Sequence, residues 1–286
     1  MISDITLGQF FPGYSPIHKL DPRTKIILAV LFIATVFVAN NPASFAFLVA
    51  FTLVLVSVSR ISLNVIMKGI KPIVFILLFT ALINLFMTGG EGEPLVSVWI
   101  FKIYTEGIAR AVFMALRVII LIVGTSLLLT YTTSPISLTD GLESLLSPLK
   151  KIGVPVHTFA MMMSIALRFI PTLVEETEKI MNAQKSRGAD FTSGSLVKRA
   201  KALVPLLIPL FVSAFKRAEE LATAMECRCY RGDYNRTKLV KLEMKGRDYG
   251  FLFLFVVVLG MMIASSILPY KIALDGAVFD VVFYKI

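Results

Sequence analysis

Apolar residues are arranged along this chain in long runs separated by short polar segments, the pattern of helices that cross a membrane. The runs cover residues 26–39, 43–59, 72–88, 108–131 and 251–268. The first run is only 14 residues long, short of the ~20 residues that span a bilayer as a helix. The pattern predicts about five spans, with the amino terminus inside the cell and the carboxyl terminus outside.

Between the last two runs lies a basic stretch, residues 156–234, in which apolar residues recur at helical steps of three, four or seven. This spacing predicts two amphipathic helices, each with one apolar stripe and an opposite charged face. The candidate stripe positions are Met162, Ile165, Phe169, Leu203, Leu207, Leu210 and Ala214. Three prolines, Pro171, Pro205 and Pro209, are expected to kink or restart these helices.

Each amphipathic pattern ends in an arginine flanked by small residues, and the two arginines are 41 residues apart. The sites read Ser186, Arg187, Gly188 and Cys227, Arg228, Cys229. A guanidinium binds carboxylates in a bidentate way, and small neighbours let a helix end enter a narrow pocket. The alternative is that both are ordinary surface cations and that Gly188 only caps a helix. Two such sites favour a partner with two equivalent grooves, and a dimeric ATPase has that property.

Composition supports a membrane protein. The chain is 56% hydrophobic with a mean hydropathy of +0.79, and 17% of its residues are charged, compared with about 25% in soluble proteins. Its net charge of +10 lies in segments between apolar runs, the pattern of cytoplasmic loops facing acidic lipid. A nucleic-acid partner is therefore disfavoured. The predicted class is an all-α polytopic protein with about five membrane helices and two long cytoplasmic amphipathic helices.

The predicted organisation has three segments. Residues 1–131 hold an amino-terminal cytoplasmic segment and the first spans, 132–248 form a cytoplasmic module with both amphipathic helices, and 249–286 hold the last span and a tail. Near the start, Asp21 is expected to cap a helix that opens at Pro22. Residues 15–25 are interpreted as a cytoplasmic anchor rather than a catalytic site.

Two arginines, Arg110 and Arg117, lie seven residues apart within a span and so share a helix face. A packing or snorkelling role is favoured over a place in a substrate pathway, because the other spans show no acidic partner.

The sequence shows no motif typical of a catalytic or cofactor-binding site. The sequence holds no GxxxxGK[ST], HExxH, GxSxG or GxGxxG motif. The histidines are His18 and His157, both at proline-bounded boundaries where a structural role is expected. The two cysteines are one residue apart, an arrangement unsuited to structural zinc or a disulfide framework. We expect no catalytic residue, no cofactor and no bound metal.

Several of these stretches together resemble the transmembrane coupling (T) component of energy-coupling factor transporters, a family of EcfT-like and CbiQ-like proteins. The resemblance rests on residues 15–25, on 132–135 with 142–149, on 166–171 with 175–176, and above all on 184–188 and 224–230. The family motif is usually Ala-Arg-Gly or close to it. This chain departs from it with Ser186, Cys227 and Cys229, so the second motif lacks its glycine.

The resemblance implies a non-enzymatic coupling subunit in the cell membrane. Two cytoplasmic ATP-binding-cassette ATPases would each receive one arginine, and the apolar stripes would hold a small substrate-binding (S) subunit for a vitamin or metal ion. The transported substrate would be chosen by that separate subunit. The alternatives are a self-sufficient secondary transporter, which would need inverted repeats and a midplane site, and an intramembrane enzyme, which would need a catalytic pair.

Overall fold

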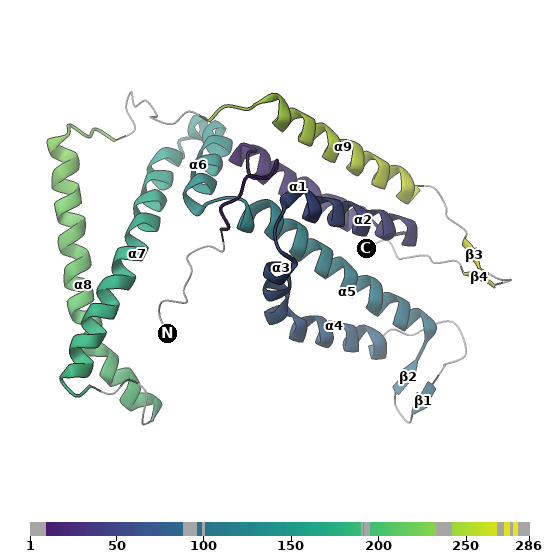
Figure 1. The fold of residues 1–286 in the computed structure, drawn as a ribbon, viewed down its shortest axis with the longest axis horizontal. Helices are drawn as coiled ribbons and strands as arrows, with labels where there is room; N and C mark the ends of the chain where they lie inside the picture. The colour runs from purple at the N-terminus through teal and green to yellow at the C-terminus, as the bar shows by residue number, and fades with distance from the viewer. Residues whose placement is uncertain are drawn as a thin grey trace. The chain divides into compact units, whose positions relative to one another are not determined.

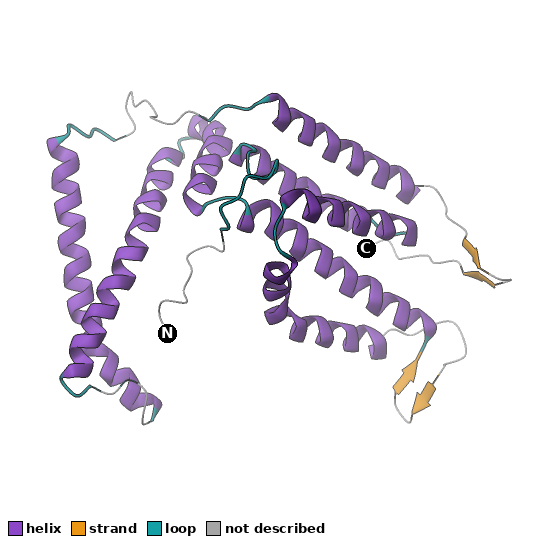
Figure 2. Cartoon of the chain, viewed as in Figure 1, coloured by secondary structure: helices purple, strands orange, loops and turns teal. Residues whose placement is uncertain are grey.

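The computed structural model describes residues 10–87, 96–98, 101–189, 191, 195–232, 242–267, 272–274 and 277–279. Its secondary structure is helical apart from two small hairpins (Figures 1 and 2), which confirms the predicted all-α class. The chain forms two compact units: a larger unit from residues 10–134 and 242–286, and a smaller unit from residues 135–241. Residues 1–9 and 233–241 of the predicted segments 1–131 and 132–248 lie outside the described residues.

The larger unit contains six labelled helices and both hairpins (Figure 1). Its helices are α1 (Pro22–Val38), α2 (Pro42–Ser59), α3 (Leu63–Ile70), α4 (Val74–Met87), α5 (Thr105–Thr125) and α9 (Gly246–Ile267). A 3-10 turn, Lys71–Ile73, separates α3 from α4, and a π-helical turn, Ser126–Tyr131, extends α5. The antiparallel hairpins pair β1 (Val96–Val98) with β2 (Phe101–Ile103) and β3 (Ile272–Leu274) with β4 (Ala277–Phe279).

Helix α1 begins as the sequence predicts. The carboxylate of Asp21 accepts a hydrogen bond from the backbone N–H of Arg23 at 2.9 Å, and Pro22 occupies the first turn. Proline suits this position because its fixed φ is already helical and its missing N–H has no partner there in any helix. The helix then packs against α5 and α9, so it forms the centre of the larger unit.

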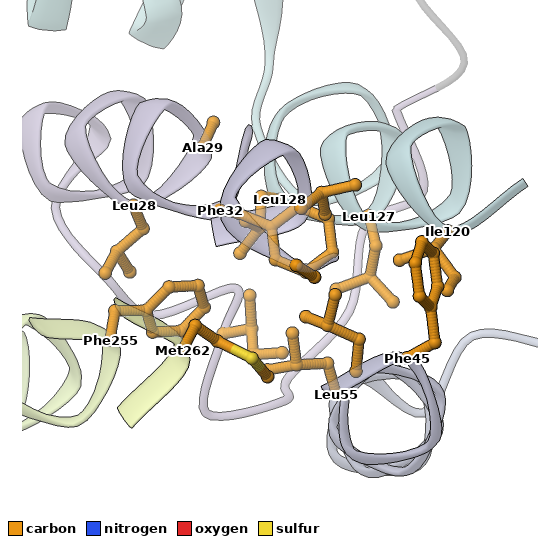
Figure 3. Close-up of a cluster of buried hydrophobic side chains, with 14 of the residues drawn as sticks. Leu28, Ala29, Phe32, Phe45, Leu55, Ile120, Leu127, Leu128, Phe255 and Met262 are labelled. Atoms are coloured by element: carbon orange, nitrogen blue, oxygen red, sulfur yellow. The ribbon is translucent and has the colours of Figure 1, made fainter. Parts of the chain in front are cut away.

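The hydrophobic core of the larger unit is built around α1. Figure 3 shows its side chains converging with those of α2, the end of α5 and α9. Phe32 is fully buried, and its ring lies 6.5 Å from that of Phe255 in α9. On the α5 side, a Cβ at Gly124 would overlap the Phe32 ring. The absence of a side chain at Gly124 therefore allows α5 to approach α1 closely.

Among the described residues, five helices are long and apolar enough to cross a membrane, which agrees with the predicted number. They are Pro42–Ser59, Leu63–Phe86, Gly107–Tyr131, Val156–Ser186 and Gly246–Ser266. The set differs from the prediction, because it leaves out the first apolar run and includes residues 156–186. Helix α1 has 17 residues, about 26 Å at the helical rise of 1.5 Å per residue. The second candidate crosses the bend at Pro72 between α3 and α4 (Figure 1).

Arg117 of α5 has a packing role within the larger unit. Its Nη2 donates to the carbonyl oxygen of Ala39 at 2.8 Å and reaches Asn40 Oδ1 at 3.5 Å. The guanidinium also lies over the ring of Phe45, 5.3 Å from its centroid. These contacts tie α5 to the turn between α1 and α2, and they support the packing interpretation over a substrate pathway.

The smaller unit consists of α6 (Pro135–Leu146), a 3-10 segment (Ser147–Ile152), and the long helices α7 (Val156–Ser186) and α8 (Leu196–Cys227). His157 Nδ1 at the start of α7 lies 2.9 Å from Glu143 Oε1 of α6, a structural contact of the kind expected for this histidine. Of the two effects expected of the prolines, a kink or a restart, the restart does not occur. Both helices continue through their internal prolines.

Candidate functional site

The long helices α7 and α8 cross each other, and their carboxyl-terminal ends lie at opposite ends of the pair (Figure 1). An ion pair between described residues joins them: Arg217 Nη2 lies 3.4 Å from Glu176 Oε2. The two side chains are 40% and 27% exposed, so water screens the pair and its contribution to stability is small. The ion pair does show where the charged halves of α7 and α8 meet.

The contacting residues of the ion pair are separated by 41 residues, the same interval that separates Arg187 from Arg228. Adding 41 to a residue number therefore leads from Glu176 to Arg217 and from Arg187 to Arg228. Each arginine lies 11 residues beyond the ion pair, about 17 Å along its helix at 1.5 Å per residue. The helix pair thus presents two equivalent ends.

Helix α7 ends in a Schellman motif with Arg187 at the last, half-helical position. The N–H of Gly188 donates to the carbonyl of Lys185 at 2.9 Å, and the N–H of Ala189 donates to that of Gln184 at 3.0 Å. Gly188 has a φ of +86°, a left-handed conformation that glycine adopts without steric cost. Gly188 thus caps the helix, which the sequence analysis gave only as part of the alternative interpretation, and this cap fixes the backbone that carries Arg187.

Helix α8 ends in the same motif without a glycine. The N–H of Cys229 donates to the carbonyl of Glu226 at 2.8 Å, and the N–H of Tyr230 donates to that of Met225 at 3.0 Å. Cys229 therefore takes the place of Gly188, with a φ of +57°. Arg228 stands at the position equivalent to Arg187. The departure from glycine that the sequence shows does not change the backbone geometry of the second site.

All six residues of the two sites are exposed: Ser186, Arg187, Gly188, Cys227, Arg228 and Cys229. Within the described part of the chain, neither guanidinium has a hydrogen bond or ion pair. Their five donors are therefore available to an external acceptor. A binding role for these six residues is not tested by the geometry alone and remains a prediction.

The predicted apolar stripe divides between two faces. Met162, Leu203 and Leu207 are 49%, 43% and 55% exposed, whereas the other four are partly buried: Ile165, Phe169, Leu210 and Ala214. The most buried apolar residue of α8 among those described is Leu206, at 5%. Periodicity located the apolar side of the helix but not which part of it faces the rest of the chain.

A wider exposed surface on α8 was missed by the sequence prediction. In its middle part, four further apolar side chains are more than half exposed: Ile208, Phe211, Val212 and Phe215. The rings of Phe211 and Phe215 lie 4.6 Å apart. Together with Leu203 and Leu207 we call these residues the α8 apolar face. Residues 203, 207, 211 and 215 recur at steps of four, a signal that was readable from the sequence.

Candidate metal ligands are the His, Cys, Asp and Glu side chains of the described residues. Among them, no group of three or more His, Cys, Asp or Glu residues is arranged to hold a metal ion. The cysteines Cys227 and Cys229 are free and exposed.

Comparison with known proteins agrees with the features described above. The family model described as CbiQ, a cobalt transport protein, matches residues 13–239. The energy-coupling factor transporter transmembrane protein EcfT of Clostridium kluyveri is 55% identical over 249 residues, covering 87% of this chain and 92% of the relative. The EcfT protein of Bacillus subtilis is 51% identical over 262 residues, covering 92% of this chain and 98% of the relative.

Proposed function

The chain belongs to the family of EcfT and CbiQ transmembrane components of energy-coupling factor transporters, and from this premise we propose that Arg187 and Arg228 each bind one subunit of a cytoplasmic ATPase pair. As a family member, the chain is a multi-pass protein of the cell membrane and a non-catalytic coupling subunit of a transporter. ATP hydrolysis therefore belongs to partner subunits.

One observation supports the arginine assignment above all others. The two arginines occupy equivalent positions in two equivalent helix ends, each 11 residues from the ion pair between α7 and α8. A partner with two copies of one groove would use such an arrangement, since each copy would meet the same local structure. A dimer of ATP-binding-cassette subunits provides two such copies.

The α8 apolar face and Met162 of α7 would hold the substrate-binding subunit. These side chains are exposed, and an amphipathic helix can lay its apolar side into a hydrophobic groove of a partner. ATP-driven approach of the two ATPases would move the arginine-bearing ends of α7 and α8. Because each helix is continuous, that movement would reach the apolar face and tilt the bound subunit, which would release a vitamin or metal ion inside the cell.

Charge reversal at the arginines tests the ATPase assignment. We expect Arg187→Glu or Arg228→Glu to weaken ATPase binding by about 2–5 kcal/mol, the range for breaking a buried interfacial charge pair. The matched control is Lys216→Glu, which reverses an exposed cation on α8 outside both motifs. Quantitative co-purification gives the readout. Retention of the ATPases by both arginine variants at the level of Lys216→Glu would reject the assignment.

A second experiment separates the two partners. Leu207 is 55% exposed, so Leu207→Asp should leave the fold intact and place a desolvated charge in the proposed subunit interface. We expect loss of the substrate-binding subunit with the ATPases retained. Thr223→Asp, at an exposed position on the same helix, serves as the control. Loss of both partners in Leu207→Asp alone would contradict a separate docking role for the apolar face.

A further inference from the structure

The two ends of the 135–241 segment, which carries the helix pair, join the larger unit beside one buried polar cluster of that unit. The chain leaves the larger unit after Ser134 and returns to it at Leu242. Thr132 lies two residues before the first link, and Lys245 lies three residues after the second. Thr132 bonds to Lys25, and Lys245 bonds to Asp248. These bonds belong to a group of hydrogen-bonded residues that we call the Lys25 cluster: Ser15, His18, Asp21, Lys25, Thr132 and Asp248.

Lys25 holds the outgoing link. It is 2% exposed, and its Nζ donates to the carbonyl of Thr132 at 2.7 Å and to that of His18 at 3.2 Å. The Thr132 hydroxyl donates back to Leu128 at 2.9 Å. The end of the α5 region is thus closed by a lysine from α1, because the last carbonyls of a helix have no partner within the helix itself.

Asp248 holds the returning link. It is 2% exposed, and one carboxylate oxygen accepts from the N–H of Lys245 at 2.7 Å. This is the reciprocal bond of a capping box at the start of α9. The other oxygen accepts from the N–H of Asp21 at 2.8 Å, the residue that caps α1. One carboxylate therefore joins the amino-terminal ends of α1 and α9.

The remaining members complete the cluster on the side of the amino-terminal loop. The hydroxyl of Ser15 lies 2.6 Å from His18 Nδ1, and His18 Nε2 lies 3.0 Å from the carbonyl oxygen of Phe11. Burial lowers the pKa of His18 despite the opposing bond to Phe11, and the charge of Lys25 lowers it further. A neutral imidazole that accepts from Ser15 and donates to Phe11 satisfies both contacts.

A satisfied buried network is rigid, and removing one charged member leaves the others desolvated and unpaired. The role of the Lys25 cluster follows from where it holds the chain. Its bonds fix the backbone on both sides of the 135–241 insertion, which carries the helix pair. The helix pair can pass on a movement in a defined direction only if the backbone at both ends of residues 135–241 is held in place. If that backbone unfolds locally, the movement is lost there.

We propose that Lys25 and Asp248 are positioning residues for energy coupling, because they anchor both links to the helix pair inside the larger unit. The proposal rests on the ATPase-driven movement of α7 and α8 proposed above. It assigns to residues 15–25 a role beyond that of a basic anchor. The residues act through the attachment of the insertion and need no contact with either partner.

The test measures movement directly in the complete transporter complex in lipid nanodiscs. Spin labels are placed on non-canonical amino acids at the exposed positions Thr223 and Gly250, which leaves Cys227 and Cys229 unchanged. Pulsed electron spin resonance then gives the distance between α8 and α9 without nucleotide and with ATP and vanadate. The variants are Lys25→Met and Asp248→Asn, and the milder Asp248→Asn keeps one acceptor oxygen. Leu48→Ala, in the fully buried core of α2, controls for general destabilisation.

We expect the distance in the unmutated complex and in Leu48→Ala to shift with nucleotide. In Lys25→Met and Asp248→Asn the distribution should broaden and the shift should be lost, with the ATPases still bound. An unchanged shift in both variants would overturn the proposal. Failure of the unmutated chain to bind ATPases would instead reject the proposed function, and co-purification on the same samples distinguishes the two results.

Discussion

Helices α1 and α8 are both rich in apolar residues, yet they use them in opposite ways. Seven of the 17 residues of α1 are buried, and the helix packs between α5 and α9. Helix α8 has 32 residues, and Leu206 is the buried one among those whose side chains are described. The same chemistry thus makes an internal core in one region and an outward surface in the other.

The difference shows that the role of an apolar side chain depends on what it packs against. For α1 the partner is the rest of the chain, so its side chains contribute to folding. For the α8 apolar face the proposed partner is the substrate-binding subunit, so we expect its side chains to contribute to binding. Mutations of equal size in the two helices should therefore change different quantities: the free energy of unfolding for α1 and partner binding for α8.

The largest expected effect is on folding. Phe32→Ala removes a fully buried ring at the centre of the larger unit and should lower the free energy of unfolding by about 3–5 kcal/mol. Phe211→Ala removes a ring that is 65% exposed, and the isolated chain should change by about 0.5 kcal/mol or less. Denaturant unfolding in mild detergent measures both values. Equal losses in the two variants would contradict the contrast between α1 and α8.

A smaller effect is expected where α5 approaches α1. A Cβ at Gly124 would overlap the Phe32 ring, so Gly124→Ala should cost about 1–3 kcal/mol by overpacking. Gly260→Ala in α9 meets no atom within 4 Å and is the control. The double variant Gly124→Ala with Phe32→Leu should recover part of the loss. Equal free energies of unfolding for Gly124→Ala and Gly260→Ala would contradict the close approach of α5 to α1 at Gly124.

The smallest effect concerns the two arginine-bearing helix ends. Gly188 and Cys229 both have positive φ, which costs a residue with a side chain about 1–2 kcal/mol. Gly188→Ala should therefore speed hydrogen exchange of the Ala189 amide, and Cys229→Gly should slow exchange of the Tyr230 amide. Both amides donate into the capping motif. Exchange rates that do not move in these directions would show that the two ends are not equivalent.

Much of the fold could be predicted from the sequence because the signals are local. Asp21 followed by Pro22 marks the start of α1, and the stripes and small residues around Arg187 and Arg228 mark α7 and α8 and their ends. Periodicity did not separate Leu206 from Leu207, since neighbouring apolar residues on one helix give no sign of which faces the chain. The prolines in α7 and α8 predicted a kink or a restart, and the continuous helices show no restart.

The Lys25 cluster was beyond local signals. Lys25 reads as one of several cations before an apolar run, and its partner Thr132 lies 107 residues away. Asp248 and Asp21 are 227 residues apart. A single sequence holds no record of such pairings, and the interpretation of residues 15–25 as a cytoplasmic anchor missed the burial of Lys25.

The central claim is that the two ends of the helix pair couple this chain to two ATPases. Its most direct test is the composition of the complex that a tagged chain brings out of its native membrane, determined by mass spectrometry. The account predicts one or two kinds of cassette ATPase, two copies in total per chain, together with a small hydrophobic subunit that reveals the class of substrate. Recovery of the chain alone, with transport retained after reconstitution, would contradict it and favour a self-sufficient secondary transporter.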